Sequence, residues 1–368
     1  MRTIIGENYY DGIKAELILT HKDENVFIRL EDFLIKYKHE TKLFFISYDL
    51  KNKIENLSSN NKDQTQFPLL HCIVPNKILP KEEFENSNPT KNSTFNFKPE
   101  FNKQEYIAKI KKIKHHIQQG DIYETNFCYS WSTNQKLENS FVLYQRLKAL
   151  TQAPFSVYAE LKDHIILSVS PERFIKKRGN QLISEPIKGT AKRKNDKAAD
   201  QAQIKLLASD PKERAENIMI VDLVRNDLSK VAIKNSVSVK ELCKIYSFKN
   251  IHQMISKVTC TVSEDVSFSA ILKALFPMGS MTGVPKIRSM KLMDTYEETQ
   301  RGLYSGSIGV MQPNGDFDLN VVIRTIIYNK SKESLSFSVG GAITIDSSPE
   351  KEYQETLTKA EALLKACQ

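Results

Sequence analysis

The sequence has few cysteines and no long apolar run, and these two absences exclude several classes of protein. Its five cysteines are odd in number, scattered and without any Cys-x-x-Cys pair, which excludes a disulfide framework and a thiolate zinc site. No stretch approaches the roughly 18 consecutive apolar residues of a membrane-spanning helix, and the start has no long apolar signal core. We therefore expect reduced thiols, a cytoplasmic location and no membrane partner.

Nucleic-acid-binding motifs are also missing, although positive charge is in excess at a formal net +9. The lysines are spread along the chain, and no helix-turn-helix, zinc-finger or ribonucleoprotein motif accompanies them. The densest cluster, between residues 109 and 116, falls on a predicted helix with a separate apolar stripe and is interpreted as a solvated face. A nucleic-acid partner is not predicted, whereas a small dianionic substrate would benefit from the positive field.

The composition changes along the chain in a way that predicts three segments. Residues 1–79 alternate short apolar runs with polar turns, which is typical of a small strand-rich N-terminal subdomain. Residues 80–101 contain Pro80, Pro89 and Pro99 among many Asn, Ser and Lys residues and indicate a linker or surface loop. The candidate chemistry lies in the remaining segment, residues 102–368, which predicts a catalytic domain.

Helical and strand patterns come in clusters within this third segment. Helices are predicted over residues 102–118, 196–208, 211–229, 267–275, 285–297 and 349–366. Strands are predicted over residues 123–132, 155–161 and 165–169, in a hairpin through 179–180, and in a group between 305 and 339. Because strands and helices do not alternate strictly, an α+β fold built on antiparallel sheets is predicted rather than a parallel doubly wound sheet.

Lys188 is the first candidate for covalent chemistry. It stands at a strand-to-turn junction between Pro186 and Gly189. An amine there is suited to nucleophilic attack, provided that burial or a nearby cation lowers its pKa. A hairpin would bring Glu172, in the run 170–174, beside this amine as a proton donor. On these residues alone, an ordinary surface lysine is the simpler interpretation.

Two predicted helices carry a similar pair of acidic residues near their starts. Glu213 and Glu216 lie three residues apart on one helix face, and Glu352 and Glu355 repeat the spacing on the last helix. If the pairs converge, their all-oxygen ligands favour magnesium over zinc. The helix dipole alone also favours glutamates in first turns, so each pair by itself is weak evidence.

Residues 276–286 form a glycine-containing loop that leads into a helix, where backbone amides would receive an anion. The loop matches neither a Walker A motif nor a dinucleotide fingerprint, so a carboxylate is the expected ligand. Arg324 would bind a second carboxylate in a bidentate manner, and Tyr304 would add a hydroxyl. The alternative is that this arginine is a surface or ion-pair residue.

Together these segments resemble the chorismate-utilising enzymes, a family that includes aminodeoxychorismate, anthranilate and isochorismate synthases. The resemblance implies antiparallel sheets forming a two-layer core flanked by helices. Lys188 stands where anthranilate synthases carry alanine and favours the branch of aminodeoxychorismate synthase component I. The resemblance covers residues 102–368 and rests on motifs at 120–123, 170–174, 185–190, 210–227, 252, 277–286, 301–309, 324 and 349–356.

The resemblance also implies a mechanism. Magnesium held by Glu216 and Glu355, with Glu213 and Glu352 as ligands or supports, would bind the ring carboxylate of chorismate. A glutamate at 172 would protonate the departing ring hydroxyl while the neutral lysine at 188 adds to the ring. Ammonia would then displace the enzyme and give 4-amino-4-deoxychorismate, the precursor of 4-aminobenzoate and folate. Further contacts to the substrate are implied for His252, Tyr304, Ser280, Gly283, Arg324 and Gly340.

The sequence has no recognisable glutaminase, so a separate glutamine amidotransferase subunit would deliver ammonia unless free ammonium suffices, and a separate lyase would remove pyruvate. Glu124 stands where relatives carry glutamine or lysine, which leaves its role open, and Ala342 departs from a Gly-Ala-Gly pattern, which leaves its backbone contact open. Feedback inhibition by tryptophan is not predicted. Anthranilate synthase component I and a catalytically silent homologue that acts as a binding protein are the alternatives.

Overall fold

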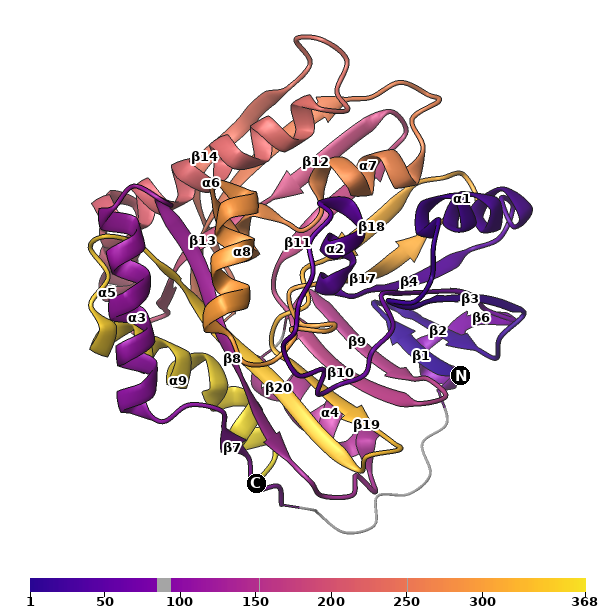
Figure 1. Cartoon of the computed structure of the whole chain (residues 1–368), viewed down its shortest axis with the longest axis horizontal. Helices are drawn as coiled ribbons and strands as arrows, with labels where there is room; N and C mark the ends of the chain where they lie inside the picture. The colour runs from indigo at the N-terminus through magenta and orange to yellow at the C-terminus, as the bar shows by residue number, and fades with distance from the viewer. Residues whose placement is uncertain (85–93, 152, 250) are drawn as a thin grey trace.

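The computed structural model describes residues 1–84, 94–151, 153–249 and 251–368. Two 10-stranded sheets form its centre, and the strand pairs described in both sheets are antiparallel. Helices cover the sheets from outside (Figure 1). The predicted α+β fold with a two-layer antiparallel core flanked by helices is confirmed.

The first sheet has the strand order β16-β8-β20-β19-β10-β9-β1-β2-β6, with β7 paired to β8. Its strands are β16 (Gly283–Val284), β8 (Glu124–Thr133), β20 (Ser334–Ile343), β19 (Thr325–Asn329), β10 (His164–Ser170), β9 (Phe155–Glu160), β1 (Arg2–Ile5), β2 (Asn8–Asp11), β6 (Lys77–Pro80) and β7 (Lys98–Pro99).

The second sheet has the order β13-β15-β12-β11-β18-β17-β4-β5-β3, with β14 paired to β15. Its strands are β13 (Ile187–Lys192), β15 (Ile251–Thr261), β12 (Gln181–Glu185), β11 (Arg173–Arg178), β18 (Phe317–Asn320), β17 (Ser307–Met311), β4 (Lys42–Ile46), β5 (Leu70–Val74), β3 (Ala15–Leu19) and β14 (Ser238–Ser247).

Alternating side chains on the strands divide the core into layers. Phe45 on β4 and Ile166 on β10 belong to the cluster between the two sheets. Their neighbours in sequence, Phe44 and Leu167, belong to the clusters on the opposite faces. Helices α1 (Val26–Lys36), α6 (Pro211–Ser229) and α7 (Phe268–Leu275) contribute to the cluster on the second sheet. Helices α3 (Lys103–Gln118), α4 (Ser140–Thr151), α8 (Lys286–Tyr296) and α9 (Pro349–Ala366) contribute to the cluster on the first.

The helix starts follow the capping chemistry expected from the sequence. Asn102 caps α3 and forms a capping box with Glu105. The Asp210 side chain accepts a hydrogen bond from the Glu213 amide, and a proline follows it at the first position of α6. The Asp196 side chain likewise caps α5 (Lys197–Ser209) by accepting a hydrogen bond from the Ala199 amide. These caps explain why the predicted helix boundaries agree closely with the structure.

Residues 1–79 supply strands to both sheets: β1 pairs with β9 of the first sheet, and β4 pairs with β17 of the second. They also contain the 11-residue helix α1 and the short helix α2 (Lys51–Ile54). The division at residues 80–101 therefore stays a prediction about folding units, since the strands on its two sides share their sheets. The centre of that segment, residues 85–93, lies outside the described residues.

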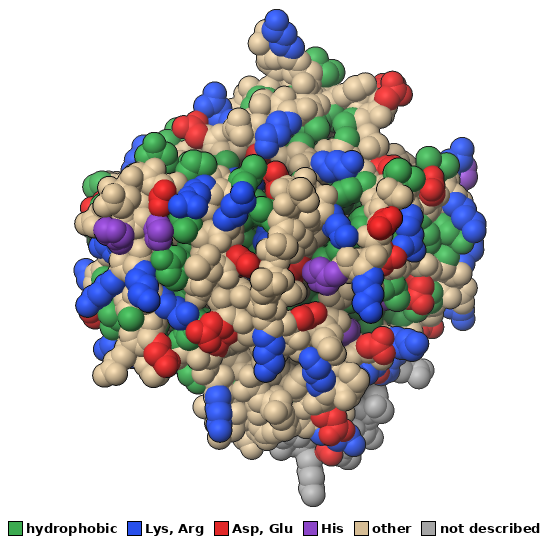
Figure 2. Space-filling view, viewed as in Figure 1, with side chains coloured by type: hydrophobic (Ala, Val, Ile, Leu, Met, Phe, Trp, Pro, Cys, Tyr) green, Lys and Arg blue, Asp and Glu red, His purple; other side chains and the backbone are tan. Residues whose placement is uncertain are grey.

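The surface and the thiols agree with two further expectations. Lys and Arg side chains are interspersed with Asp and Glu on the face seen in Figure 2. The five cysteines are buried and unpaired, as structural thiols would be. No helix in the described part of the chain combines the length and apolar character needed to cross a bilayer. The cytoplasmic location stays a prediction.

Candidate active site

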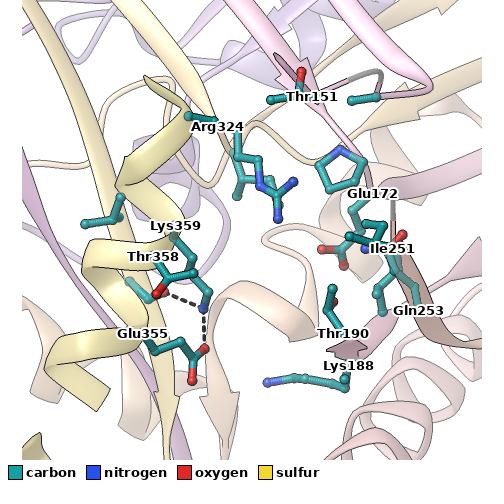
Figure 3. Close-up of a pocket in the computed structure, with 18 of the residues that line it drawn as sticks. Thr151, Glu172, Lys188, Thr190, Ile251, Gln253, Arg324, Glu355, Thr358 and Lys359 are labelled. Carbon is teal, nitrogen blue, oxygen red and sulfur yellow. Dashed lines mark hydrogen bonds and ion pairs between the residues drawn. The ribbon is translucent and has the colours of Figure 1, made fainter. Parts of the chain in front are cut away.

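A cavity of about 690 Å³ lies where β13, β20, α6 and α9 meet. The Glu172 side chain from the β10–β11 connection, the Lys188 side chain from β13 and the Arg324 side chain from the β18–β19 connection face this common space (Figure 3). His252, Gly283 and Glu352 are not among the lining residues. The structure thus brings together nine of the predicted site residues: Glu172, Lys188, Glu213, Glu216, Ser280, Tyr304, Arg324, Gly340 and Glu355.

Lys188 on β13 is buried and paired with carboxylates. Its Nζ donates a hydrogen bond to Glu124 Oε1 at 2.9 Å and lies 3.9 Å from Glu216 Oε2. Burial favours the neutral amine, but attraction to Glu124 and then to Glu216 outweighs it and raises the pKa of Lys188. The expectation of a lowered pKa is therefore wrong for the protein without its substrate. The sequence could not show this, because the two carboxylates that surround the amine come from distant segments.

Glu172 follows β10 and is buried in the cavity wall. Burial raises the pKa of its carboxyl group to about 7, although the Ser280 hydroxyl and the positive charge of Lys188 oppose the shift. A carboxyl group with this pKa carries a proton during part of the time at neutral pH, so it is suited to act as a general acid.

Arg324 is a buried cation of the cavity whose charge is not paired among the residues that the structure describes. Its guanidinium has no hydrogen-bond or ion-pair partner there and points into the cavity (Figure 3). Its backbone adopts the left-handed region at φ 50°, which is uncommon for an arginine and typical of functional sites. Burial lowers its pKa. Together with Tyr304 on the same lining, it provides donors for a carboxylate, and the alternative of an ion-pair arginine is excluded within the described residues.

The two glutamate pairs converge from α6 and α9. Lys212 Nζ lies 3.6 Å from Glu216 Oε1 and 3.6 Å from Glu352 Oε1, so one side chain bridges the helices. A Cβ atom added to Gly341 on β20 would lie 3.5 Å from Glu352 Oε2 and 3.8 Å from Glu355 Oε1. The convergence inferred from the repeated spacing is therefore present in the fold.

The chemistry of this cluster fits a hard divalent cation. Glu216 Oε1 is buried without a hydrogen-bond partner, and burial, with the charges of Glu124 and Glu213 adding to it, raises the pKa of Glu216 to about 7 against the opposing lysines. Burial also raises the pKa of Glu213. A cation would satisfy the unpaired oxygen and relieve this repulsion. No preformed group of three or more ligating side chains occurs within the described ranges, so the fit rests on oxygen chemistry and charge.

Three predicted residues have other surroundings. His252 is fully buried between the Ser247 hydroxyl, 2.8 Å from its Nδ1, and Asp200 Oδ1, 2.8 Å from its Nε2. Both ring nitrogens are engaged by these partners and His252 does not line the cavity, so its contact with substrate stays a prediction. Glu352 Oε1 accepts a hydrogen bond from the Ser347 hydroxyl, and Glu352 contacts Lys212 without lining the cavity.

Gly283 on β16 is required for packing rather than for lining. A Cβ atom there would lie 2.3 Å from the Glu124 carbonyl oxygen and 2.4 Å from Ser289 Oγ. The glycine lets β16 approach β8 and so fixes the strand that carries Glu124. Its role is therefore to position the cavity wall.

Several residues at the site were not predicted. Glu124 binds Lys188 through Oε1 while its Oε2 is buried without a partner. Lys359 on α9 donates to Glu355 Oε1 at 2.7 Å and to the Gly340 carbonyl at 2.8 Å. Lys212 precedes Glu216 by four residues, and Lys359 follows Glu355 by four residues, so helical spacing was the signal for both.

Comparison with known proteins gives a consistent result. The model of the chorismate binding enzyme family matches residues 7–365. Aminodeoxychorismate synthase component 1 of Salmonella typhimurium is 38% identical over 260 residues, covering 71% of this chain and 57% of that protein. Anthranilate synthase component 1 of Bacillus subtilis is 36% identical over 340 residues, covering 90% of this chain and 65% of that protein. The chain thus spans less than two thirds of the length of these curated relatives.

The fold is shared with a solved structure. Anthranilate synthase component I from Streptococcus pneumoniae has a TM-score of 0.83 at 22% identity, over 99% of this chain and 92% of that chain. The family model extends over nearly the whole sequence, including the residues before 102 that the motifs did not reach. The chain belongs to the chorismate binding enzyme family.

Proposed function

We propose that the chain is an aminodeoxychorismate synthase component that converts chorismate and ammonia to 4-amino-4-deoxychorismate for 4-aminobenzoate and folate biosynthesis. The observation that carries the proposal is the shared cavity of Lys188, a buried Glu172 with a pKa of about 7, and an unpaired Arg324. These groups supply a nitrogen nucleophile, a proton donor and a carboxylate receptor. The relatives named aminodeoxychorismate synthase component 1 support the same reading.

In the proposed reaction, Arg324 and Tyr304 bind the enolpyruvyl carboxylate and hold the ring against Lys188. Glu172 donates its proton to the ring hydroxyl, which leaves as water while the nitrogen of Lys188 bonds to the ring. Ammonia then bonds to the ring, the bond to Lys188 breaks, and Glu172 is reprotonated from solvent. The net change is chorismate and ammonia to 4-amino-4-deoxychorismate and water.

Lys188 must lose its proton before it adds to the ring. Glu124 accepts its hydrogen bond in the structure and is the nearest carboxylate that can hold that proton. Magnesium held by Glu216 and Glu355, with Glu213 and Glu352 nearby, would supply positive charge that offsets the glutamates and the ring carboxylate. Ser280 and Gly340 line the same cavity and would contact the substrate.

Ammonia would come from a separate glutamine amidotransferase subunit, and a separate lyase would release pyruvate from the product. The term component 1 in the names of the relatives supports a partner of this kind. We propose no nucleic-acid partner and a cytoplasmic location.

Anthranilate synthase is the second candidate, favoured by the relative that covers 90% of this chain. Incubation of the purified chain with chorismate, magnesium and ammonium separates the two functions. The proposal predicts 4-aminobenzoate only after a lyase is added and no fluorescent anthranilate. Anthranilate without lyase would reject the proposal, and the same assay on Lys188→Ala controls for contaminating activity.

A further inference from the structure

Three lysines face the glutamates of the cavity, and Lys212 is the most loosely bound of them. Its Nζ is 3.6 Å from both Glu216 Oε1 and Glu352 Oε1, which is an ion pair but too long for a hydrogen bond. By contrast, Lys188 and Lys359 each donate a hydrogen bond of 2.9 Å or less. Lys212 therefore neutralises the cluster without being fixed to it.

The position of Lys212 is unusual for a cation. It lies in the first turn of α6, where the helix dipole disfavours positive charge. The neighbouring glutamates compensate for this, because without a counter-ion the carboxylates of Glu216 and Glu352 would repel each other across the gap. The Glu216 oxygen that faces Lys212 also remains without a hydrogen bond, so it is free to take a stronger ligand.

The Lys212 side chain also has a way out of the cluster. It is 46% exposed, whereas the Lys188 side chain is 12% exposed. A long lysine side chain at the surface changes rotamer in less than microseconds and needs no movement of the helix backbone. It can therefore leave the gap without disturbing the fold.

We propose that Lys212 is an internal counter-ion that occupies the gap between the two glutamate pairs in the metal-free protein and leaves it when a divalent cation binds. The inference rests on the proposed function for the assignment of the cation cluster. Exchange of one ammonium for one divalent ion keeps the four glutamates compensated in both states. The presence of Lys212 in the gap also makes the affinity for the divalent cation lower than it would be without the lysine, because the cation must displace it.

The test is metal binding measured directly on the purified, chelator-treated protein. Lys212→Met keeps much of the side-chain length and removes the charge, so calorimetric titration with Mg²⁺ and Mn²⁺ should show about tenfold tighter binding, or about 1.4 kcal/mol. Lys212→Arg retains the charge and should bind close to wild type. In the absence of metal, Lys212→Met should melt at a lower temperature than wild type and gain more from added Mg²⁺.

Lys192→Met is the matched control for long-range charge. Lys192 lines the cavity and has no ion pair within the described ranges, so its removal changes the field but vacates no gap. An affinity for Mg²⁺ in Lys212→Met that does not exceed the affinity in Lys192→Met overturns the inference, and so does a lack of metal binding in every variant.

The outcomes are separable from those of the proposed function. A wild-type chain that binds Mg²⁺ with the predicted lysine competition but forms no 4-amino-4-deoxychorismate refutes the proposed function alone. A chain that makes this product while Lys212→Met and wild type bind Mg²⁺ equally well refutes the inference alone.

Discussion

Glu172 should make the stability of the protein depend on pH in a direction opposite to most carboxyl groups. Its pKa is about 7 in the folded chain against a reference value of 4.5. The unfolded chain therefore loses this proton first as the pH rises, and the free energy of unfolding falls between these two values. The full shift corresponds to about 3.4 kcal/mol at 1.36 kcal/mol per pKa unit.

The magnitude can be followed between two conditions. Linkage predicts that Glu172 costs about 1.4 kcal/mol at about pH 5.5 and about 3.4 kcal/mol at about pH 8.5, a difference of about 2 kcal/mol. Glu172→Gln removes this titration and keeps the shape of the side chain. Urea unfolding at both pH values should show that the variant loses about 2 kcal/mol less than wild type as the pH rises.

Glu361→Gln is the control, since Glu361 lies at the exposed rim of the same cavity and Lys365 lowers its pKa. Its variant should lose the same stability as wild type over this range. If Glu172→Gln also loses as much as wild type, the raised pKa is refuted. The catalytic counterpart is a fall in kcat/KM of wild type above about pH 7, with a loss of at least about 100-fold in Glu172→Gln.

Substitutions at Arg324, His252 and Gly283 test the remaining assignments. Arg324→Ala should raise KM for chorismate about 30-fold or more and Arg324→Lys should restore part of the loss, while equal KM values would remove the carboxylate contact. His252→Gln should lower the melting temperature with kcat/KM within about threefold of wild type, because its partners are structural; a loss of about 100-fold in a folded variant would return His252 to the substrate. Gly283→Ala should destabilise the chain by about 1–3 kcal/mol in urea and Gly341→Ala by clearly less, since only the former places a Cβ atom 2.3 Å from a carbonyl; equal losses would contradict this account.

Local chemistry made many elements of the fold predictable from the sequence, whereas helix α4 and the paired strands β14 and β15 were not predicted. Caps such as Asp210 and the hairpin signals indicated where helices and strands begin. The grouping of strands and helices, which do not alternate strictly, indicated antiparallel sheets. The sequence could not predict that residues 1–79 contribute strands to both sheets. The apolar residues of a strand such as β4 indicate that the strand is buried, but they do not indicate which strand it pairs with. The pairing of β4 with β17 joins residues more than 250 positions apart, so it depends on how the whole chain is arranged.

At the site, too, local spacing could be predicted from the sequence and contacts between distant residues could not. The repeated spacing of the glutamates predicted that their pairs converge, and the structure brings them together around Gly341 and Lys212. The charge state of Lys188 could not be predicted, because it depends on Glu124, which is 64 positions away in the sequence. The surroundings of His252 depend in the same way on Asp200, 52 positions away on α5.

The central claim is that Lys188 forms a covalent bond to the substrate ring. Mass spectrometry of the protein mixed with chorismate and magnesium in the absence of ammonia tests it directly. The account predicts an adduct with the mass of chorismate less water on the peptide that contains Lys188, absent in Lys188→Ala and lost when ammonium is added. Amination at a normal rate by Lys188→Ala, with no adduct on the wild-type chain, would contradict it.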